Sequence, residues 1–404
     1  MLDKLFKNLN AKIESDYLID AFNKAISDND EFYLTTDFVK KLNDFYDVIP
    51  RNYKALLLTV EKLKENLNLK LFVKILYHLI GYKKSFTETF KSLTLPSAYG
   101  ESDILYDCAH ALAILGHVPN FFNELSKRGV DFSVARDTVR IFDINMESDS
   151  KIAGKPYLSL ENFSYYKAYV YTNTLWIERL RFEISNGANY PIVVFKNKVD
   201  SQIKIAINGE KVSKNGLIVG SAGVDDDENS FSATLIEKDD FYEGYFVNED
   251  NLCSNKSEKI LKTDWEIIFM PTDNVLKVHI PSVGEFTPEK LIKSFEKAYQ
   301  VFKNCYSEYN FKGFLTCTWF LSHGLKGIIK ETSNIAGFRN CFKIFPMKKA
   351  GTSIFEYVFN LKISSVNEID YNSLLEDNSL RRGIKQKAKN GVIFHEFGGF
   401  RPFE

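Results

Sequence analysis

The sequence has few cysteines, and those it has are isolated. Its 404 residues include five of them, Cys108, Cys253, Cys305, Cys317 and Cys341. An odd number of single cysteines does not suggest a disulfide framework, and no two are spaced as a zinc-binding pair. We therefore expect reduced thiols and no metal site.

The sequence also lacks an excess of charge of either sign. It contains 52 lysines and arginines against 53 aspartates and glutamates, which gives a formal net charge of −1. Proteins that bind nucleic acids or anionic membranes usually carry a strong positive field. We therefore predict neither of these partners and expect a small-molecule substrate, while the oligomeric state stays open.

Long apolar runs are absent as well. The longest candidate, LFVKILYHLI at residues 71–80, is interrupted by Lys74 and is shorter than the roughly 20 residues that span a bilayer. The N-terminal segment MLDKLFKNLN alternates charge with Leu and Phe and contains no apolar signal-peptide core. These features predict a soluble, cytoplasmic protein.

The N-terminal part shows the spacing of amphipathic helices. Leu57, Val60, Leu63 and Leu67 recur every three or four residues, which places them on one face of a helix. We predict an all-α domain over residues 1–150, with the helical pattern continuing to about Leu180.

Beyond Leu180 the pattern changes to alternation of apolar and polar residues. The segments YPIVVFKN, QIKIAI, FSATLIEK and FYEGYFVN predict half-buried β-strands. Asn208-Gly209 predicts a hairpin directly after QIKIAI. We predict an α/β region over residues 151–404, which divides into two half-sheets at 151–270 and 271–404.

The segment from Val275 to Phe342 organises this second region. It predicts a strand at 275–280, a helix at 288–305, a strand at 313–319 and a helix at 322–330. The strands CFKIF and SIFEYVFN and a helix around 371–389 follow. The predicted fold class is α+β, an all-α N-terminal domain followed by a mixed β-sheet region flanked by helices.

The loop between the first strand and helix of this segment predicts an anion site. Gly284 lies in the loop, and Thr287 and Pro288 begin the helix. Unpaired N–H groups and the positive end of the helix dipole meet at such a place. This loop is the most function-like feature of the sequence.

Several short motifs in this order resemble a known family. They are Arg181-Phe182-Glu183, His279-Ile280-Pro281 followed by Gly284, Cys317 to Leu321, and Ser333-Asn334-Ile335 followed by Phe338. The order resembles the second half of the GNAT acyltransferase fold. More specifically, the chain is similar to a bacterial GNAT-like acyltransferase-domain family, in which a helical N-acyltransferase N-terminal domain precedes a GNAT-like C-terminal domain.

The resemblance implies acyl-CoA as co-substrate, with acetyl-CoA as one form. In GNAT enzymes the diphosphate of CoA lies on backbone N–H groups of the loop after the central strand. The positions that correspond here are Ile280, Ser282, Val283, Gly284 and Thr287. Asn334, at the start of the short helix that leads to Phe342, is a further candidate for contact with the cofactor. This loop lacks the basic or amide residue of the family pattern and contains Glu285.

Three residues are candidates for chemistry or ligand contact. His279, with a usual pKa of about 6.5, can act as a general base or can fix the end of its strand. Cys317 can act as a nucleophile if its pKa is lowered, or can be a buried inert thiol. Asn334 can face a ligand, or can serve with Ser333 as the cap of a short helix.

These features favour one function and leave two alternatives. The first is an acyltransferase that moves an acyl group from acyl-CoA to an unidentified amine or other nucleophile. The alternative is a GNAT-like fold that has lost CoA binding and acts as a binding or scaffold protein. A cysteine hydrolase built on Cys317 and His279 is the third possibility.

Overall fold

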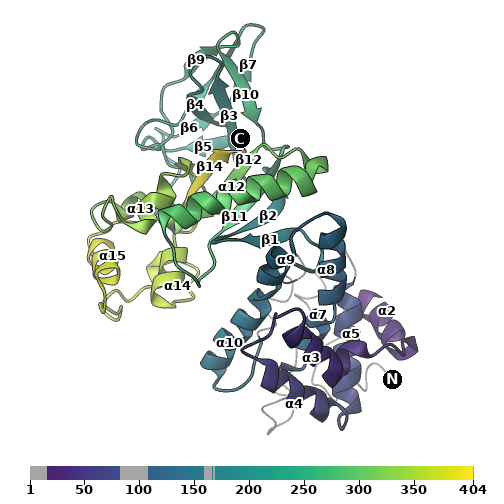
Figure 1. Cartoon of the computed structure of the whole chain (residues 1–404). Helices are drawn as coiled ribbons and strands as arrows, with labels where there is room; N and C mark the ends of the chain where they lie inside the picture. The colour runs from purple at the N-terminus through teal and green to yellow at the C-terminus, as the bar shows by residue number, and fades with distance from the viewer. Residues whose placement is uncertain (1–15, 82–107, 159–165, 167–168, 404) are drawn as a thin grey trace. The chain divides into compact units, whose positions relative to one another are not determined.

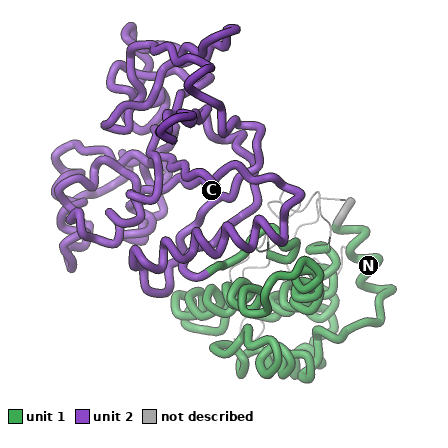
Figure 2. Tube along the Cα trace, turned by 45° about the horizontal axis from the view of Figure 1, so that its top comes forward, with its two compact units in different colours: residues 1–177 green, residues 178–404 purple. Residues whose placement is uncertain are grey.

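The computed structural model describes residues 16–81, 108–158, 166 and 169–403 of the chain. The chain divides into two compact units, residues 1–177 and 178–404 (Figure 2). Helices make up most of the described part of the first unit, whereas sheets flanked by helices make up the second (Figure 1). The predicted α+β class is confirmed.

The first unit is held together by helix packing and by a buried polar contact. Asp143 is 1% exposed and accepts hydrogen bonds from the backbone N–H and the side-chain amide of Asn52, at 3.1 and 2.8 Å. The contact joins α10 (Ile141–Ala153) to the beginning of α4 (Tyr53–Leu63). The described helices are α2 (Asp16–Ser27), α3 (Thr36–Asp44), α4 (Tyr53–Leu63), α5 (Leu67–Ile80), α7 (Ala111–Leu115), α8 (Val118–Lys127), α9 (Phe132–Val139) and α10 (Ile141–Ala153), and the described strand is β1 (Thr174–Ile177).

The second unit contains a central mixed sheet. Its strands lie in the spatial order β2 (Leu180–Asn186), β11 (Asn274–His279), β12 (Gly313–Thr318), β14 (Phe397–Pro402) and β13 (Lys343–Pro346). Strands β11 and β12 are parallel, and the other neighbours are antiparallel. A parallel pair needs a long crossover connection, which here contains α12 (Pro288–Cys305). The predictions of a strand, a helix and a strand at these three places are confirmed.

Helix α12 covers one face of the central sheet (Figure 1). The ring of Phe295 on this helix lies 5.9 Å from that of Phe182 on β2 and 5.2 Å from that of Phe314 on β12. Thr287 caps the helix by accepting a hydrogen bond from the N–H of Lys290, and Pro288 follows at the first position. The start of this helix is therefore fixed next to the end of β11.

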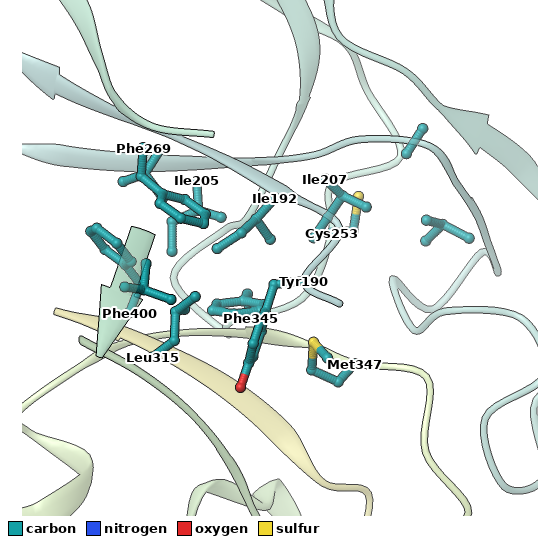
Figure 3. Close-up of a cluster of buried hydrophobic side chains, with 14 residues drawn as sticks. Tyr190, Ile192, Ile205, Ile207, Cys253, Phe269, Leu315, Phe345, Met347 and Phe400 are labelled. Atoms are coloured by element: carbon teal, nitrogen blue, oxygen red, sulfur yellow. The ribbon is translucent and has the colours of Figure 1, made fainter. Parts of the chain in front are cut away.

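A second sheet packs against the opposite face of the central sheet (Figure 3). It is antiparallel, and the core between the sheets contains Leu315, Phe345 and Phe400 from one side and residues such as Ile192, Ile205 and Phe269 from the other. Its strands are, in spatial order, β10 (Trp265–Phe269), β3 (Ile192–Asn197), β4 (Ile203–Ile207), β8 (Phe241–Phe246) and β7 (Ile236–Glu237), with β9 (Glu258–Leu261) beside β8.

The predicted hairpin at Asn208-Gly209 is wrong. Gly209 has the positive φ of +84° that such a turn requires, but the strands on its two sides do not pair. Strand β4 pairs with β3 and β8, while β5 (Glu210–Val212) pairs with β6 (Phe231–Ala233) in a separate ribbon. The turn therefore connects β4 in the second sheet to β5 in the two-stranded ribbon.

The last strand of the central sheet was not predicted. Strand β14 inserts between β12 and β13, although its sequence FGGFRP has two glycines that weaken the strand signal. A Cβ at Gly398 would lie 2.2 Å from the ring of Phe345, and a Cβ at Gly399 would lie 2.9 Å from Phe342 and Leu321. Large side chains of neighbouring segments occupy this space, so glycine is required there.

Three other predicted elements after β12 are corrected. The predicted strand SIFEYVFN is helix α14 (Ser353–Phe359), whose buried residues follow a helical spacing. The predicted helix 322–330 is replaced by the short 3₁₀ turns Trp319–Leu321 and His323–Leu325. The last helix, α15 (Ser379–Lys389), begins later than predicted because Asn378 caps it by accepting a hydrogen bond from the N–H of Arg381.

Candidate active site

Strands β11 and β12 separate toward their C-terminal ends. Their ladder contains only the pairs Leu276 with Phe314 and Lys277 with Leu315. Each strand continues to pair on its other side, β11 with β2 as far as His279 and β12 with β14 as far as Thr318. Beyond the ladder the hydroxyl of Thr316 donates a hydrogen bond to the carbonyl of Val278 at 3.1 Å. The backbone pairing of β11 and β12 therefore ends here, next to the start of α12, and this place is called the opening below.

His279 and Glu183 form a pair at this opening. His279 Nε2 lies 2.7 Å from Glu183 Oε2. The register sets His279 opposite Arg181 and Lys277 opposite Glu183, so His279 and Glu183 are diagonal neighbours on one face of the sheet. Their side chains are 26% and 30% exposed, which leaves the pair accessible from solvent.

The surroundings fix the protonation of this pair. Burial lowers the pKa of His279 below its usual 6.5, and the hydrogen bond with Glu183 offsets this only in part. Burial raises the pKa of Glu183, but the hydrogen bond with His279 and the nearby positive charges outweigh it and leave the pKa below 4.5. At neutral pH the ionised carboxylate accepts the Nε2–H of a neutral imidazole, and Nδ1 keeps a free electron pair.

Cys317 lies on β12 beside the same opening but lacks the environment of a nucleophile. Burial raises the pKa of its thiol to about 12, and the negative charge of Glu396 acts in the same direction. Among the described residues, no hydrogen bond joins Cys317 to His279. A thiol that stays protonated at neutral pH reacts slowly, so the geometry does not support a cysteine–histidine nucleophile.

The loop from Pro281 to Thr287 presents a row of unused donors. The backbone N–H groups of residues 282–287 donate no hydrogen bond to any described residue. Gly284 has φ of +89°, a conformation that glycine adopts without strain. Five of the residues predicted to bind CoA therefore lie together at the end of β11 and the start of α12, namely Ile280, Ser282, Val283, Gly284 and Thr287.

Glu285 does not direct its charge into this loop. Its carboxylate lies 2.6 Å from Lys290 Nζ on the first turn of α12, and its side chain is 75% exposed. The pKa of Glu285 is lowered chiefly by the hydrogen bond with Lys290, so the carboxylate is ionised. The acidic residue of the loop therefore forms an ion pair with its own neighbour on α12.

Asn334 is the first residue of α13 (Asn334–Arg339). Its side chain is exposed and takes part in none of the described hydrogen bonds, whereas Ser333 caps the helix by accepting a hydrogen bond from the N–H of Ala336. Helix α13 packs on the start of α12, because a Cβ at Gly337 would lie 2.9 Å from Pro288. Asn334 thus lies on a helix that borders the loop.

Sequence reasoning assigned no role to two residues that the structure brings to the site. Glu183 belongs to a segment that matched the family, but only the register of β2 against β11 pairs it with His279. Arg179 precedes β2, and its Nη2 donates a hydrogen bond to the carbonyl of Pro281 at 2.7 Å. No local pattern indicates either contact, since the residues are about 100 positions apart in sequence.

The described residues contain neither a metal site nor a membrane-spanning helix. No group of three or more His, Cys, Asp or Glu side chains there is arranged to hold a metal ion. No described helix is both long and apolar enough to cross a membrane.

The sequence matches one family of known domains. The match is to the GNAT-like C-terminal domain and covers residues 175–401. It includes β2, β11, the loop, α12 and β12, and therefore the whole candidate site. No curated protein matches the chain significantly.

Solved acyltransferase structures share the fold of the chain at low sequence identity. An acyltransferase in complex with decanoyl-CoA superimposes with a TM-score of 0.60 at 12% identity, covering 99% of this chain and 98% of that one. An acyltransferase in complex with CoA and 10C-teicoplanin gives 0.58 at 14% identity, covering 91% and 88%. An acyltransferase in complex with decanoyl-CoA and teicoplanin gives 0.56 at 14% identity, with the same coverage. The likeness extends over the helical and the sheet regions.

Proposed function

The chain belongs to the family defined by the GNAT-like C-terminal domain, and from this premise we propose that it is an acyltransferase in which His279 is the general base. The donor is an acyl-CoA, and the acceptor is a small molecule with an amine or another nucleophile. The resemblance seen in the sequence is confirmed at the level of the family and the fold.

One observation carries the proposal. The His279–Glu183 pair lies where β11 parts from β12, directly before the loop with unused N–H donors. A base and an anion site are thus a few residues apart on the same strand and its following loop. Solved structures of the same fold were crystallised with CoA or decanoyl-CoA, which supports the choice of donor.

The site fits an acyl-CoA by its chemistry. The free N–H groups of residues 282–287 suit the diphosphate, and the buried guanidinium of Arg179 adds a positive charge. When bound, acyl-CoA would supply an acyl group activated as a thioester. A Cβ added at Gly284 would meet only the Cδ of Arg179, at 3.9 Å. The space around Gly284 is otherwise open.

The residues of the chain would perform the proton transfer. His279 Nδ1 takes a proton from the nucleophile of the acceptor while that nucleophile attacks, and Glu183 holds the ring through Nε2–H and stabilises the imidazolium that forms. The low pKa of His279 keeps the imidazole neutral at physiological pH, and the neutral ring can accept a proton. The proton then leaves to solvent or with the departing thiol.

A protein of this fold that has lost CoA binding is the alternative. The observation that favours it is the absence of a basic or amide residue within the loop 281–287 itself. The ion pair of Glu285 with Lys290 and the presence of Arg179 weaken that argument. A cysteine hydrolase is disfavoured because the Cys317 thiol stays protonated.

Ligand-dependent stability tests the proposal without knowledge of the acceptor. We expect acetyl-CoA or decanoyl-CoA at 100 times its dissociation constant to stabilise the folded state by about 2.7 kcal/mol, which raises the melting temperature. The His279→Gln variant should keep this shift, because His279 acts on the acceptor. If millimolar acyl-CoA leaves the melting temperature unchanged, the proposal is wrong and the scaffold alternative is favoured.

A further inference from the structure

Arg179 is a buried arginine at the head of β2. It is 7% exposed, and its backbone N–H donates a hydrogen bond to Ser294 Oγ on α12 at 2.9 Å. Its Nη2 donates to the carbonyl of Pro281, and its Cζ lies 5.0 Å from the ring centre of Phe286. The side chain therefore reaches from the turn before β2 into the loop 281–287.

No acidic group among the described residues neutralises this arginine. Arg179 makes no ion pair with a described residue, and its Nε and Nη1 are buried with no hydrogen-bond partner. The nearest acidic neighbours in sequence and in the loop have other partners. Glu178 pairs with Lys293 and Lys297 at 3.4 and 3.2 Å, and Glu285 pairs with Lys290.

A buried cation without a counter-charge is costly, which calls for an explanation. Burial lowers the pKa of Arg179 below its usual 12.5, yet a guanidinium keeps its proton at any physiological pH. Removing a charge from water destabilises the folded chain unless an opposite charge compensates it. An anion that binds at the loop would provide that compensation.

The loop around Arg179 is built to accept an anion. The backbone N–H groups of residues 282–287 donate no hydrogen bond to any described residue, and the loop leads directly into α12, which begins at Pro288. The cation and the row of donors come from segments about 100 residues apart that meet here. A diphosphate combines two negative charges with oxygens for several N–H donors at once.

We propose that Arg179 binds the diphosphate of the acyl-CoA donor and supplies the positive charge that the loop 281–287 itself lacks. The inference rests on the proposed function. It assigns a role to a residue outside the loop, contributed by the turn before β2. It also explains how a loop that carries Glu285 and no basic residue can hold a nucleotide diphosphate.

A comparison of ligands with and without the diphosphate tests this role. The full chain and its Arg179→Met and Arg179→Lys variants would be titrated calorimetrically with CoA and with pantetheine, which lacks the nucleoside and all three phosphates of CoA. We expect Arg179→Met to weaken CoA binding about 10- to 100-fold and to leave pantetheine binding within about twofold. Arg179→Lys should give an intermediate loss, because lysine keeps the charge without the planar fork of donors.

Two further measurements separate a binding role from a structural one. Arg382→Met is the matched control, since Arg382 is exposed on α15 and donates to the carbonyl of Glu376; it should bind CoA like the unaltered chain. Inorganic diphosphate should compete with CoA on the unaltered chain, a result that needs no variant to fold.

The outcomes are distinct. If Arg179→Met binds CoA normally, or loses CoA and pantetheine equally, the role of Arg179 is refuted while the acyltransferase proposal stands. If inorganic diphosphate fails to compete with CoA, the role is also refuted. If the unaltered chain binds neither CoA nor acyl-CoA, the proposed function fails and this inference fails with it.

Discussion

The His279–Glu183 pair gives a prediction that can be worked out from its geometry. Replacing Glu183 with Gln keeps the shape of the side chain and removes the negative charge 2.7 Å from Nε2. A hydrogen bond to a charged group contributes about 1.5–3 kcal/mol, and the lower value applies because both side chains are more than a quarter exposed. A loss of about 1.5 kcal/mol from the transition state corresponds to roughly a tenfold lower kcat.

The effect on His279 itself can be measured without a substrate. Glu183 raises the pKa of His279 against the stronger lowering by burial, so Glu183→Gln should lower that pKa further. NMR titration of labelled histidine ring signals would follow this change, with His279→Gln identifying the resonance. In a transfer assay, the acidic limb of kcat/KM should have its midpoint below pH 6.5 and move to lower pH in Glu183→Gln, because the neutral imidazole is the active form.

Several results would refute this reasoning. A pKa of His279 above 6.5 would mean that the ion pair and not burial governs the ring. A pKa that rises in Glu183→Gln would mean that Glu183 does not stabilise the imidazolium. In turnover, His279→Gln should cost about 10²- to 10⁴-fold, and adding Glu183→Gln to it should cost little more. A double variant with the product of the two single losses would show that the residues act independently.

Three further predictions concern the opening and the sheet around it. Thr316→Val removes the hydroxyl that donates to Val278, and should lower the free energy of unfolding in urea by about 1 kcal/mol; an unchanged value would mean that water replaces the bond. Gly398→Ala places a Cβ 2.2 Å from the ring of Phe345 and should cost about 1–3 kcal/mol in the same assay, whereas a neutral result would show that the ring moves freely. Cys317→Ala should keep acyl transfer within about threefold, since its thiol has a pKa of about 12, and complete loss of activity would revive a cysteine mechanism.

The central elements of the fold were predictable because their signals are local. The Thr-Pro start of α12 and the apolar runs of β11 and β12 identify those elements without any knowledge of the rest of the chain. Strand β14 was not predictable in this way. Its glycines are explained only by the rings of Phe345 and Phe342, which come from distant parts of the sequence.

The residues of the candidate site likewise differ in whether local sequence predicts them. His279 and the loop from Ser282 to Thr287 could be proposed from sequence because they lie at the end of a predicted strand and directly after it. The partners that give them chemical character, Glu183 and Arg179, come from the other side of a strand pair that joins residues about 100 positions apart. Pairing across such a distance follows from the register of the sheet, which sequence patterns of a single chain do not specify.

The position of β14 has a consequence for how the protein is made. The strand closest to the C-terminal end of the sequence lies inside the sheet, between β12 and β13. During synthesis both neighbours emerge earlier, and until residues 397–402 follow them each presents an open edge. The nascent chain therefore carries an unfinished sheet until residues 397–402 are made, and a product that ended just before Phe397 would expose two open strand edges and be prone to aggregate.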